Sequence, residues 1–169
     1  MSAPEVWLRG PVAGVPALLQ PVAHALLQAV EDMERVVASL DDERLRRRPG
    51  GIASVAFHLR HATGSLDRLC TYALGRPLDD AQRRALAEEG SASEAGAELL
   101  AGFRAGVERA VAQLRATDPA DLALPRTIGR AALPTTVIGL LYHAGEHTAR
   151  HTGQAITTAK AINGMLENP

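Results

Sequence analysis

Apolar residues recur at three- and four-residue steps in four long stretches of the chain, separated by polar or proline- and glycine-rich segments. This spacing places the apolar side chains on one face of an α-helix. The predicted long helices span residues 15–40, 53–74, 93–114 and 134–162. A shorter and mostly polar helix is expected over residues 79–89, with Gly90 as its natural end.

Residues that start or interrupt helices divide the chain at the same places. Ser54 is a suitable N-cap for the second long helix, and Pro21 is tolerated if it lies in the first turn of the first. We expect a charged loop over residues 41–51 and a proline-rich connector over residues 117–134. No segment carries a strand signal. The sequence therefore predicts an all-α fold, a four-helix bundle with a short extra helix between the second and third long helices.

The chain has 169 residues, which suits a single domain over residues 1–169 with an irregular N-terminal arm over residues 1–14. Its net charge is −1, so no nucleic acid partner or membrane surface is expected, and no apolar stretch reaches the roughly 18 residues that span a bilayer. Cys70 is the single cysteine, which excludes an intrachain disulfide. No signal peptide is evident, and a cytoplasmic location is expected.

Three of the six histidines lie four residues apart, at His143, His147 and His151, within the last predicted helix. A four-residue step advances about 6 Å and rotates about 40°, so two such imidazoles can share one ion. An eight-residue step advances about 12 Å and rotates about 80°, which separates the outer two. The spacing predicts a metal site that uses one adjacent pair, and His147 belongs to either pair.

A third ligand is expected from a facing helix, because catalytic divalent metals commonly take three protein ligands and leave a position open. The candidates are His58 and His61 on the second helix, and His24 on the first. An isolated histidine such as His24 is more often a satisfied core or surface residue. Ligation by histidine alone suits zinc, nickel, iron or copper better than magnesium or calcium.

Two further residues of the last helix are candidates for the site. Glu146 precedes His147 and is offset from it by about 100° around the helix. It is a candidate to orient a ligand imidazole or to act as a catalytic base, and the alternative is a salt bridge. Tyr142 is a candidate for the pocket wall. Small residues at Gly145, Ala149 and Gly153 also repeat every four residues, which predicts close packing of another helix.

Two motifs resemble those of the DinB/YfiT-like superfamily of four-helix metalloproteins. The segment from Ser54 to His61, Ser-Val-Ala-Phe-His-Leu-Arg-His, resembles the family's second-helix motif. The segment His147-Thr-Ala-Arg-His151-Thr-Gly-Gln resembles its fourth-helix motif. By position, the resemblance implies that His61, His147 and His151 bind the metal. Thr152 stands where many members carry arginine, which puts any role of that arginine in doubt here.

The resemblance also implies a left-handed up-down-down-up bundle, usually a homodimer, with zinc or nickel bound by three histidines. His58 and His143 would then be neighbours of the site, as hydrogen-bond partners of the ligands, as pocket walls or as alternative ligands. Tyr142 is a further candidate neighbour. Some relatives resemble transferases or isomerases that use a low-molecular-weight thiol, and others are described only as metal-dependent hydrolases. The hypotheses are therefore a metal-dependent thiol S-transferase or hydrolase acting on a small molecule, a non-catalytic metal- or ligand-binding protein, and a bundle whose metal is structural.

Overall fold

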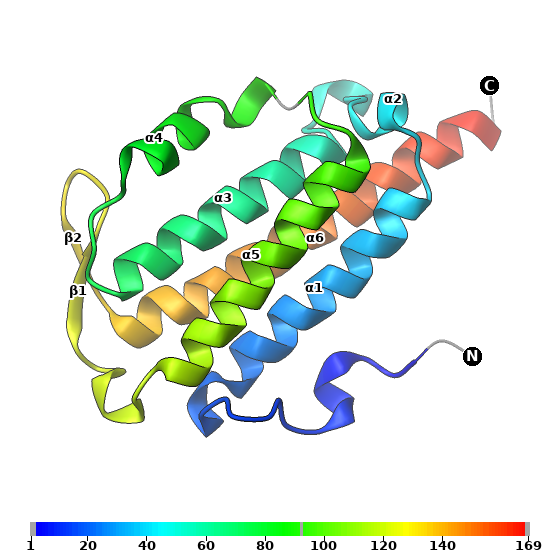
Figure 1. Ribbon diagram of the computed structural model, residues 1–169. Helices are drawn as coiled ribbons and strands as arrows, with labels where there is room; N and C mark the ends of the chain where they lie inside the picture. Colours follow the sequence, from blue (N-terminus) through cyan, green and yellow to red (C-terminus); the bar gives the residue numbers. More distant parts are fainter. Residues whose placement is uncertain (1–2, 92, 168–169) are drawn as a thin grey trace.

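The computed structural model describes residues 3–91 and 93–167, and it is predominantly helical (Figure 1). The four long helices are α1 (Gln20–Ala38), α3 (Val55–Ala73), α5 (Gly96–Ala116) and α6 (Val137–Glu167). The predicted all-α class is confirmed, and each predicted long helix has a counterpart within a few residues. Helix α1 begins at Gln20 with proline in its first turn, and the hydroxyl of Ser54 caps α3 by accepting the Phe57 N–H at 3.2 Å.

The shorter elements occupy the connections between these helices. They are η1 (Val6–Arg9), η2 (Ala17–Leu19), α2 (Asp42–Leu45), η3 (Pro49–Gly51), α4 (Asp80–Ala87), η4 (Glu89–Ser91), η5 (Pro119–Asp121), β1 (Pro125–Ile128) and β2 (Leu133–Thr136). Elements labelled η are single turns of 3-10 helix. The predicted extra helix between the second and third long helices is present as α4.

Each long helix packs mainly against two others. Helix α3 contacts both α5 and α6, and α1 contacts the same two helices. Helices α1 and α6 run in one direction, and α3 and α5 run in the opposite direction (Figure 1). This is the up-down-down-up arrangement. Because neighbouring α3 and α5 are parallel, the chain must return along the bundle between them, and α4 lies on that return path.

One continuous apolar core lies between the four helices. Its largest fully buried side chains include Phe103 of α5, Leu26 and Met33 of α1, Leu59 of α3 and Leu141 of α6. These residues occupy the faces that the three- and four-residue repeats predict. Burial of these faces stabilises the helices, since most helical stability in proteins comes from the packing of an apolar face.

The connector before α6 contains a two-stranded antiparallel hairpin, which corrects the expectation of no strand. Strand β1 pairs with β2 in the register Pro125 opposite Thr136 and Ile128 opposite Leu133. Four-residue strands that contain prolines lack a readable alternation, so the sequence pattern did not reveal them. Tertiary contacts hold the hairpin: the Arg126 guanidinium donates to the carbonyl of Ala73 at the end of α3 at 2.9 Å.

Two other segments also differ from expectation. The segment 41–51 is not all loop, because Asp41 caps the short helix α2 and Leu45 of that helix enters the core. The N-terminal arm contains the 3-10 turn η1 and lies along α1. Buried Val6 anchors this arm, and its backbone N–H donates to the side chain of Gln28 at 2.9 Å.

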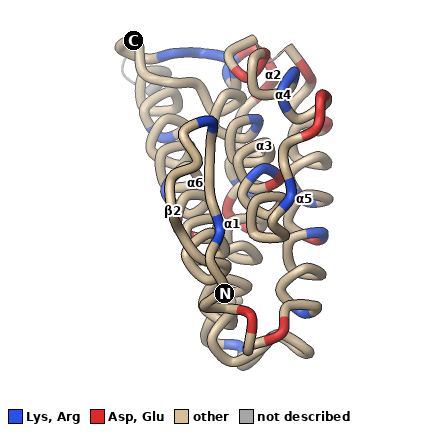
Figure 2. Tube along the Cα trace, turned by 90° about the vertical axis from the view of Figure 1, so that its left-hand side faces the viewer, with Lys and Arg blue, Asp and Glu red and all other residues tan. Residues whose placement is uncertain are grey.

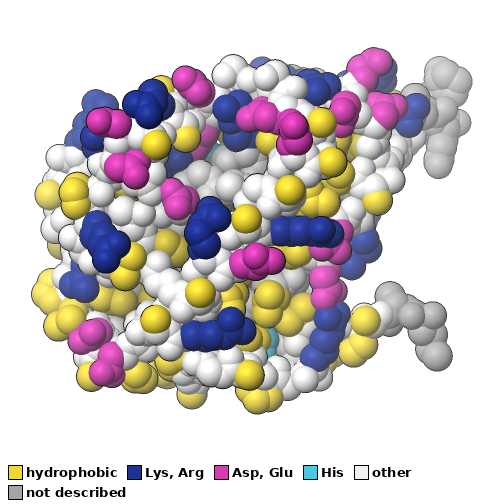
Figure 3. Space-filling model, in the orientation of Figure 1, with side chains coloured by type: hydrophobic (Ala, Val, Ile, Leu, Met, Phe, Trp, Pro, Cys, Tyr) yellow, Lys and Arg dark blue, Asp and Glu magenta, His cyan; other side chains and the backbone are white. Residues whose placement is uncertain are grey.

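Basic and acidic side chains are mixed rather than segregated in two views of the molecule. Figure 3 shows them interspersed across the face built by α4, α5 and α1, and Figure 2 shows the same mixture along the chain from a second direction. No helix in residues 3–91 and 93–167 combines the length and hydropathy that crossing a bilayer requires.

The predicted stripe of small residues on α6 packs closely at only one end. A Cβ at Gly145 would lie 3.2 Å from Cγ1 and 3.4 Å from Cα of Val22, so α1 approaches α6 closely there. Gly153 has no atom within 4 Å of such a Cβ, and Ala149 is exposed. The expectation of close packing is therefore correct for Gly145 and wrong for Gly153.

This difference predicts opposite outcomes for the two alanine substitutions. Gly153→Ala is expected to raise the free energy of unfolding by about 0.5–1 kcal/mol, because alanine is the better helix former and its methyl group meets nothing. Gly145→Ala is expected to lack this gain, because the added methyl group pushes against Val22. Urea unfolding of both variants measures the difference, and equal gains would contradict close packing at Gly145.

Candidate metal centre

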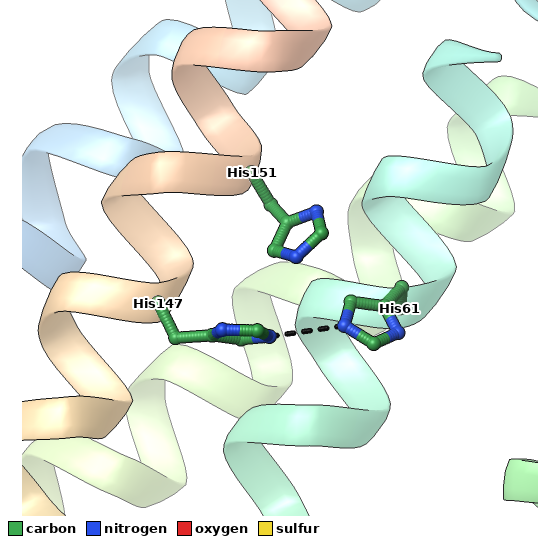
Figure 4. Close-up of side chains that lie close together, drawn as sticks. All are labelled: His61, His147 and His151. Carbon is green, nitrogen blue, oxygen red and sulfur yellow. Dashed lines mark hydrogen bonds between the residues drawn. The ribbon is translucent and has the colours of Figure 1, made fainter. Parts of the chain in front are cut away.

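The structure brings together three of the histidines singled out in the sequence. His61 projects from α3, and His147 and His151 project from successive turns of α6, so that all three rings point toward one region between the helices (Figure 4). One nitrogen from each ring lies within 4.8 Å of the other two. All three residues are half-buried. The arrangement is compatible with a metal site.

Both nitrogens of the His61 ring have close partners. Nε2 lies 2.9 Å from Nε2 of His147, and Nδ1 lies 2.8 Å from Oε2 of Glu89. The other carboxylate oxygen of Glu89 accepts a hydrogen bond from the Arg68 guanidinium at 2.6 Å. A carboxylate can only accept at Nδ1, so this contact places the proton of the neutral ring on Nδ1 and the lone pair on Nε2.

The His151 ring is oriented by a fourth histidine. Nδ1 of His151 lies 3.0 Å from Nδ1 of His58, which is 5% exposed and comes from the first turn of α3. This contact leaves Nε2 of His151 as the nitrogen that is free to face the other two rings. His58 is therefore a direct neighbour of the three-histidine cluster.

His147 is the exception in the cluster, because its buried Nδ1 atom has no hydrogen-bond partner among the described residues. An unpartnered buried polar nitrogen costs on the order of 1–3 kcal/mol. Native structures rarely retain such a group without a functional reason.

Burial and mutual repulsion lower the pKa values of His58, His147 and His151. Burial is the main cause that lowers the pKa of His151 to about 4, and the nearby rings of His61 and His147 add to the effect. Burial followed by the charge of His61 also lowers the pKa of His147 and of His58. Burial opposes ionisation of Glu89, but the hydrogen bonds from His61 and Arg68 outweigh it, so the pKa of Glu89 is lowered. Neutral imidazoles with free lone pairs are metal ligands.

The remaining candidates from the sequence lie around this cluster or away from it. His143 is exposed, and its ring centre lies 5.2 Å from that of His147. Glu146 forms a two-pronged ion pair with Arg150 and lies 3.3 Å from Nδ1 of His143. Tyr142 is 63% exposed.

The first helix contributes nothing to the cluster. Nε2 of His24 lies 3.1 Å from the carbonyl oxygen of Gly10, where it helps to hold the N-terminal arm on α1. These contacts agree with the interpretation of His24 as a structural histidine.

Glu89 is the residue near the cluster that sequence reasoning missed. It stands in the turn η4 after the short polar helix, a setting in which glutamates are usually exposed. The one local signal is that Glu89 is followed by Gly90, where the helical segment ends. Its burial depends on contact with α3, where its partner Arg68 is 21 residues away in the sequence.

Comparison with known proteins bears on the same residues. The family model described as the DinB superfamily matches residues 25–155, a span that includes all three clustered histidines. The chain belongs to the DinB superfamily. A search of curated proteins found no match.

A solved structure supports the fold of this DinB-superfamily protein. The structure is titled as a conserved protein from Enterococcus faecalis; it superposes with a TM-score of 0.68 at 19% sequence identity. The match covers 85% of the present chain and 95% of the other. At this identity the likeness concerns the fold alone.

Proposed function

We propose that this DinB-superfamily protein is a metal-dependent enzyme that acts on a small molecule, as a low-molecular-weight thiol S-transferase or as a hydrolase. The observation that carries the proposal is the convergence of ring nitrogens from His61, His147 and His151 within 4.8 Å. Zinc or nickel is the proposed metal, because borderline divalent ions prefer imidazole nitrogen.

The residues present fit such an ion. Metal-binding histidines almost always have their second nitrogen held by a carboxylate, carbonyl or similar group. Here Glu89 holds Nδ1 of His61, and His58 holds Nδ1 of His151. The lowered pKa values of His147 and His151 supply unprotonated rings at neutral pH. The protein thus presents lone pairs without first having to remove protons.

When bound, the ion would supply a Lewis acid with a coordination position open to water, a thiol or the electrophile. The chain's own part is to hold the three imidazoles, keep them neutral and leave one side accessible. Their partial exposure supports access, since a purely structural site is usually closed.

A cavity of about 590 Å³ lies next to the cluster and supports binding of a small molecule there. Its lining includes His58, Arg150, Gln154 and Thr158. His58 touches His151 directly, so a molecule in this cavity would be separated from the cluster by the His58 side chain. We propose this cavity as the place of the substrate.

Any thiol in the reaction would have to come from outside the chain. Cys70 is the single cysteine, and burial, followed by the charge of Asp67, raises the pKa of its thiol to about 12. A thiol with this pKa is scarcely ionised at neutral pH and is a poor nucleophile. An external low-molecular-weight thiol is therefore part of the proposal. The homodimer that the resemblance implies, and the cytoplasmic location expected from the single cysteine and the lack of an evident signal peptide, are proposed as well.

Metal analysis and turnover assays test the proposed function. Protein purified without nickel resin is expected to contain close to one zinc or nickel ion per chain. Electrophilic substrates are then assayed with and without added thiol: thiol-dependent turnover indicates a transferase, and turnover in water alone indicates a hydrolase. Metal-loaded protein that binds thiol without turnover would contradict catalysis and favour a binding protein. Protein that takes up no divalent metal would overturn the proposal.

A further inference from the structure

We propose that Glu89 is a positioning residue that fixes the His61 ring with its proton on Nδ1 and its lone pair on Nε2, aimed at the other two histidines. This inference rests on the proposed metal function. Oε2 of Glu89 lies 2.8 Å from Nδ1 of His61, and Nε2 of His61 lies 2.9 Å from Nε2 of His147. Nothing in the family resemblance assigns a role to this glutamate.

The carboxylate is itself held in a single orientation. Its second oxygen accepts from Nη1 of Arg68 at 2.6 Å, and the side chains of Glu89 and Arg68 are only 11% and 12% exposed. Each carboxylate oxygen therefore has one assigned partner. A charge-assisted pair in such surroundings holds its geometry more firmly than an exposed pair does.

The interior of α3 leaves room for this pair at Gly64. A Cβ at this position would lie 2.9 Å from Nη1 of Arg68 and 3.0 Å from Oε1 of Glu89. Glycine inside a helix is unfavourable, so its presence here has a packing reason. Any larger residue would displace the two groups that orient His61.

The return path between α3 and α5 delivers Glu89 to this place. Helix α4 is capped by Asp79, and the amide of Gln82 bonds to Asp67 at 2.6 Å and to Thr71 at 2.7 Å, which ties α4 to α3. The turn η4 then follows α4 and packs on α3. The segment that contains α4 and η4 therefore places Glu89 beside His61, in addition to connecting the parallel helices α3 and α5.

The substitution Glu89→Gln separates this role from simple packing. Glutamine has one acceptor oxygen, and Arg68 can only donate, so the oxygen is expected to face Arg68. The amide NH₂ then faces Nδ1 of His61 and donates to it. The proton of the neutral ring must move to Nε2, which removes the lone pair that would bind the metal. Shape and volume are nearly unchanged.

The tautomer of His61 is measured in metal-free protein by long-range ¹H–¹⁵N NMR at mildly alkaline pH. Wild-type protein is expected to carry the proton on Nδ1, and Glu89→Gln is expected to carry it on Nε2. The affinity for Co²⁺, measured by chelator competition and by the visible absorption of the bound ion, is expected to fall about 10- to 100-fold in the variant. The matched control is Glu88→Gln, the exposed neighbour, which should change neither.

A second pair of variants serves if Glu89→Gln fails to fold. Gly64→Ala is expected to displace the side chains of Arg68 and Glu89 and to weaken Co²⁺ binding about 3- to 10-fold. Gly102→Ala is its control, because a Cβ there meets no atom within 4 Å. Loss of affinity in Gly64→Ala alone supports the inference, and equal affinities in both variants contradict it.

The outcomes distinguish this inference from the proposed function. A wild-type His61 protonated on Nε2, or a Glu89→Gln protein that keeps both the wild-type tautomer and the wild-type Co²⁺ affinity, overturns the role of Glu89. Wild-type protein that binds no Co²⁺ overturns the metal function instead, and the tautomer measurement still decides whether Glu89 orients the ring.

Discussion

Replacing His147 with alanine is expected to weaken binding of Zn²⁺ roughly 100- to 1000-fold and to remove any metal-dependent turnover. Structural zinc sites with four ligands bind with about 10–16 kcal/mol, which is about 2.5–4 kcal/mol per ligand, and each 1.4 kcal/mol is a tenfold change. His147 is the most informative position, because its Nε2 faces His61 and its ring also neighbours that of His151.

His143→Ala is the matched control, since this residue lies one turn earlier on α6, is exposed and stands outside the three-nitrogen cluster. It should bind Zn²⁺ nearly as well as wild type. Competition with a chromophoric chelator measures both affinities, and circular dichroism checks that both variants remain folded. A full complement of tightly bound zinc in His147→Ala, or an equal loss in His143→Ala, would show that the ion sits elsewhere.

Metal-free protein is expected to lose about 1–2 kcal/mol of its free energy of unfolding between pH 7 and pH 5. Burial and neighbouring rings lower the pKa of His151 to about 4, whereas the pKa of histidine in the unfolded chain is near 6.5. Below pH 6.5 His151 is therefore protonated in the unfolded state but not in the folded state, so the free energy of unfolding falls as the pH falls. The figure is smaller than the full shift would give, because pH 5 still lies above the folded pKa of His151 and because the ring is partly in contact with water.

Other titratable groups near His151 also lower the free energy of unfolding as the pH falls. The pKa values of His58 and His147 are also lowered, so both add to the loss in this window. The lowered pKa of Glu89 adds a further loss only at more acidic pH, since its unfolded pKa lies near 4.5. Urea unfolding in the presence of a chelator measures the effect at both pH values. His151→Gln should show a shallower dependence on pH, and a slope equal to that of wild type would contradict the assignment to this ring.

The histidine cluster shows what the spacing of residues along one helix can predict about a metal site and what it cannot. Spacing on one helix excludes His143 and His151 as joint ligands of one ion, but both adjacent pairs satisfy it equally. The resemblance favoured His147 and His151, and the structure places those two beside His61, with His143 exposed outside the group. The relative placement of α3 and α6 decides this, because it sets which turn of α6 faces His61.

Glu89 and the hairpin show the opposite case. A glutamate after a polar helix has the same local pattern whether it is exposed or buried, and its contact with Arg68 depends on how α4 folds back onto α3. The β1–β2 hairpin is too short for alternation to reveal, and the bond from Arg126 to the end of α3 helps to hold it. Both features depend on residues that are distant in sequence.

The sequence by itself determined the four long helices, their buried faces and the Ser54 cap of α3, because helix periodicity and capping depend on residues within a few positions of one another. It also pointed to His61, His147 and His151 through motif and spacing. Only the tertiary structure decided that His58 orients His151 and that Glu89 and Arg68 orient His61. Those contacts join separate elements, and their geometry follows from how the helices pack.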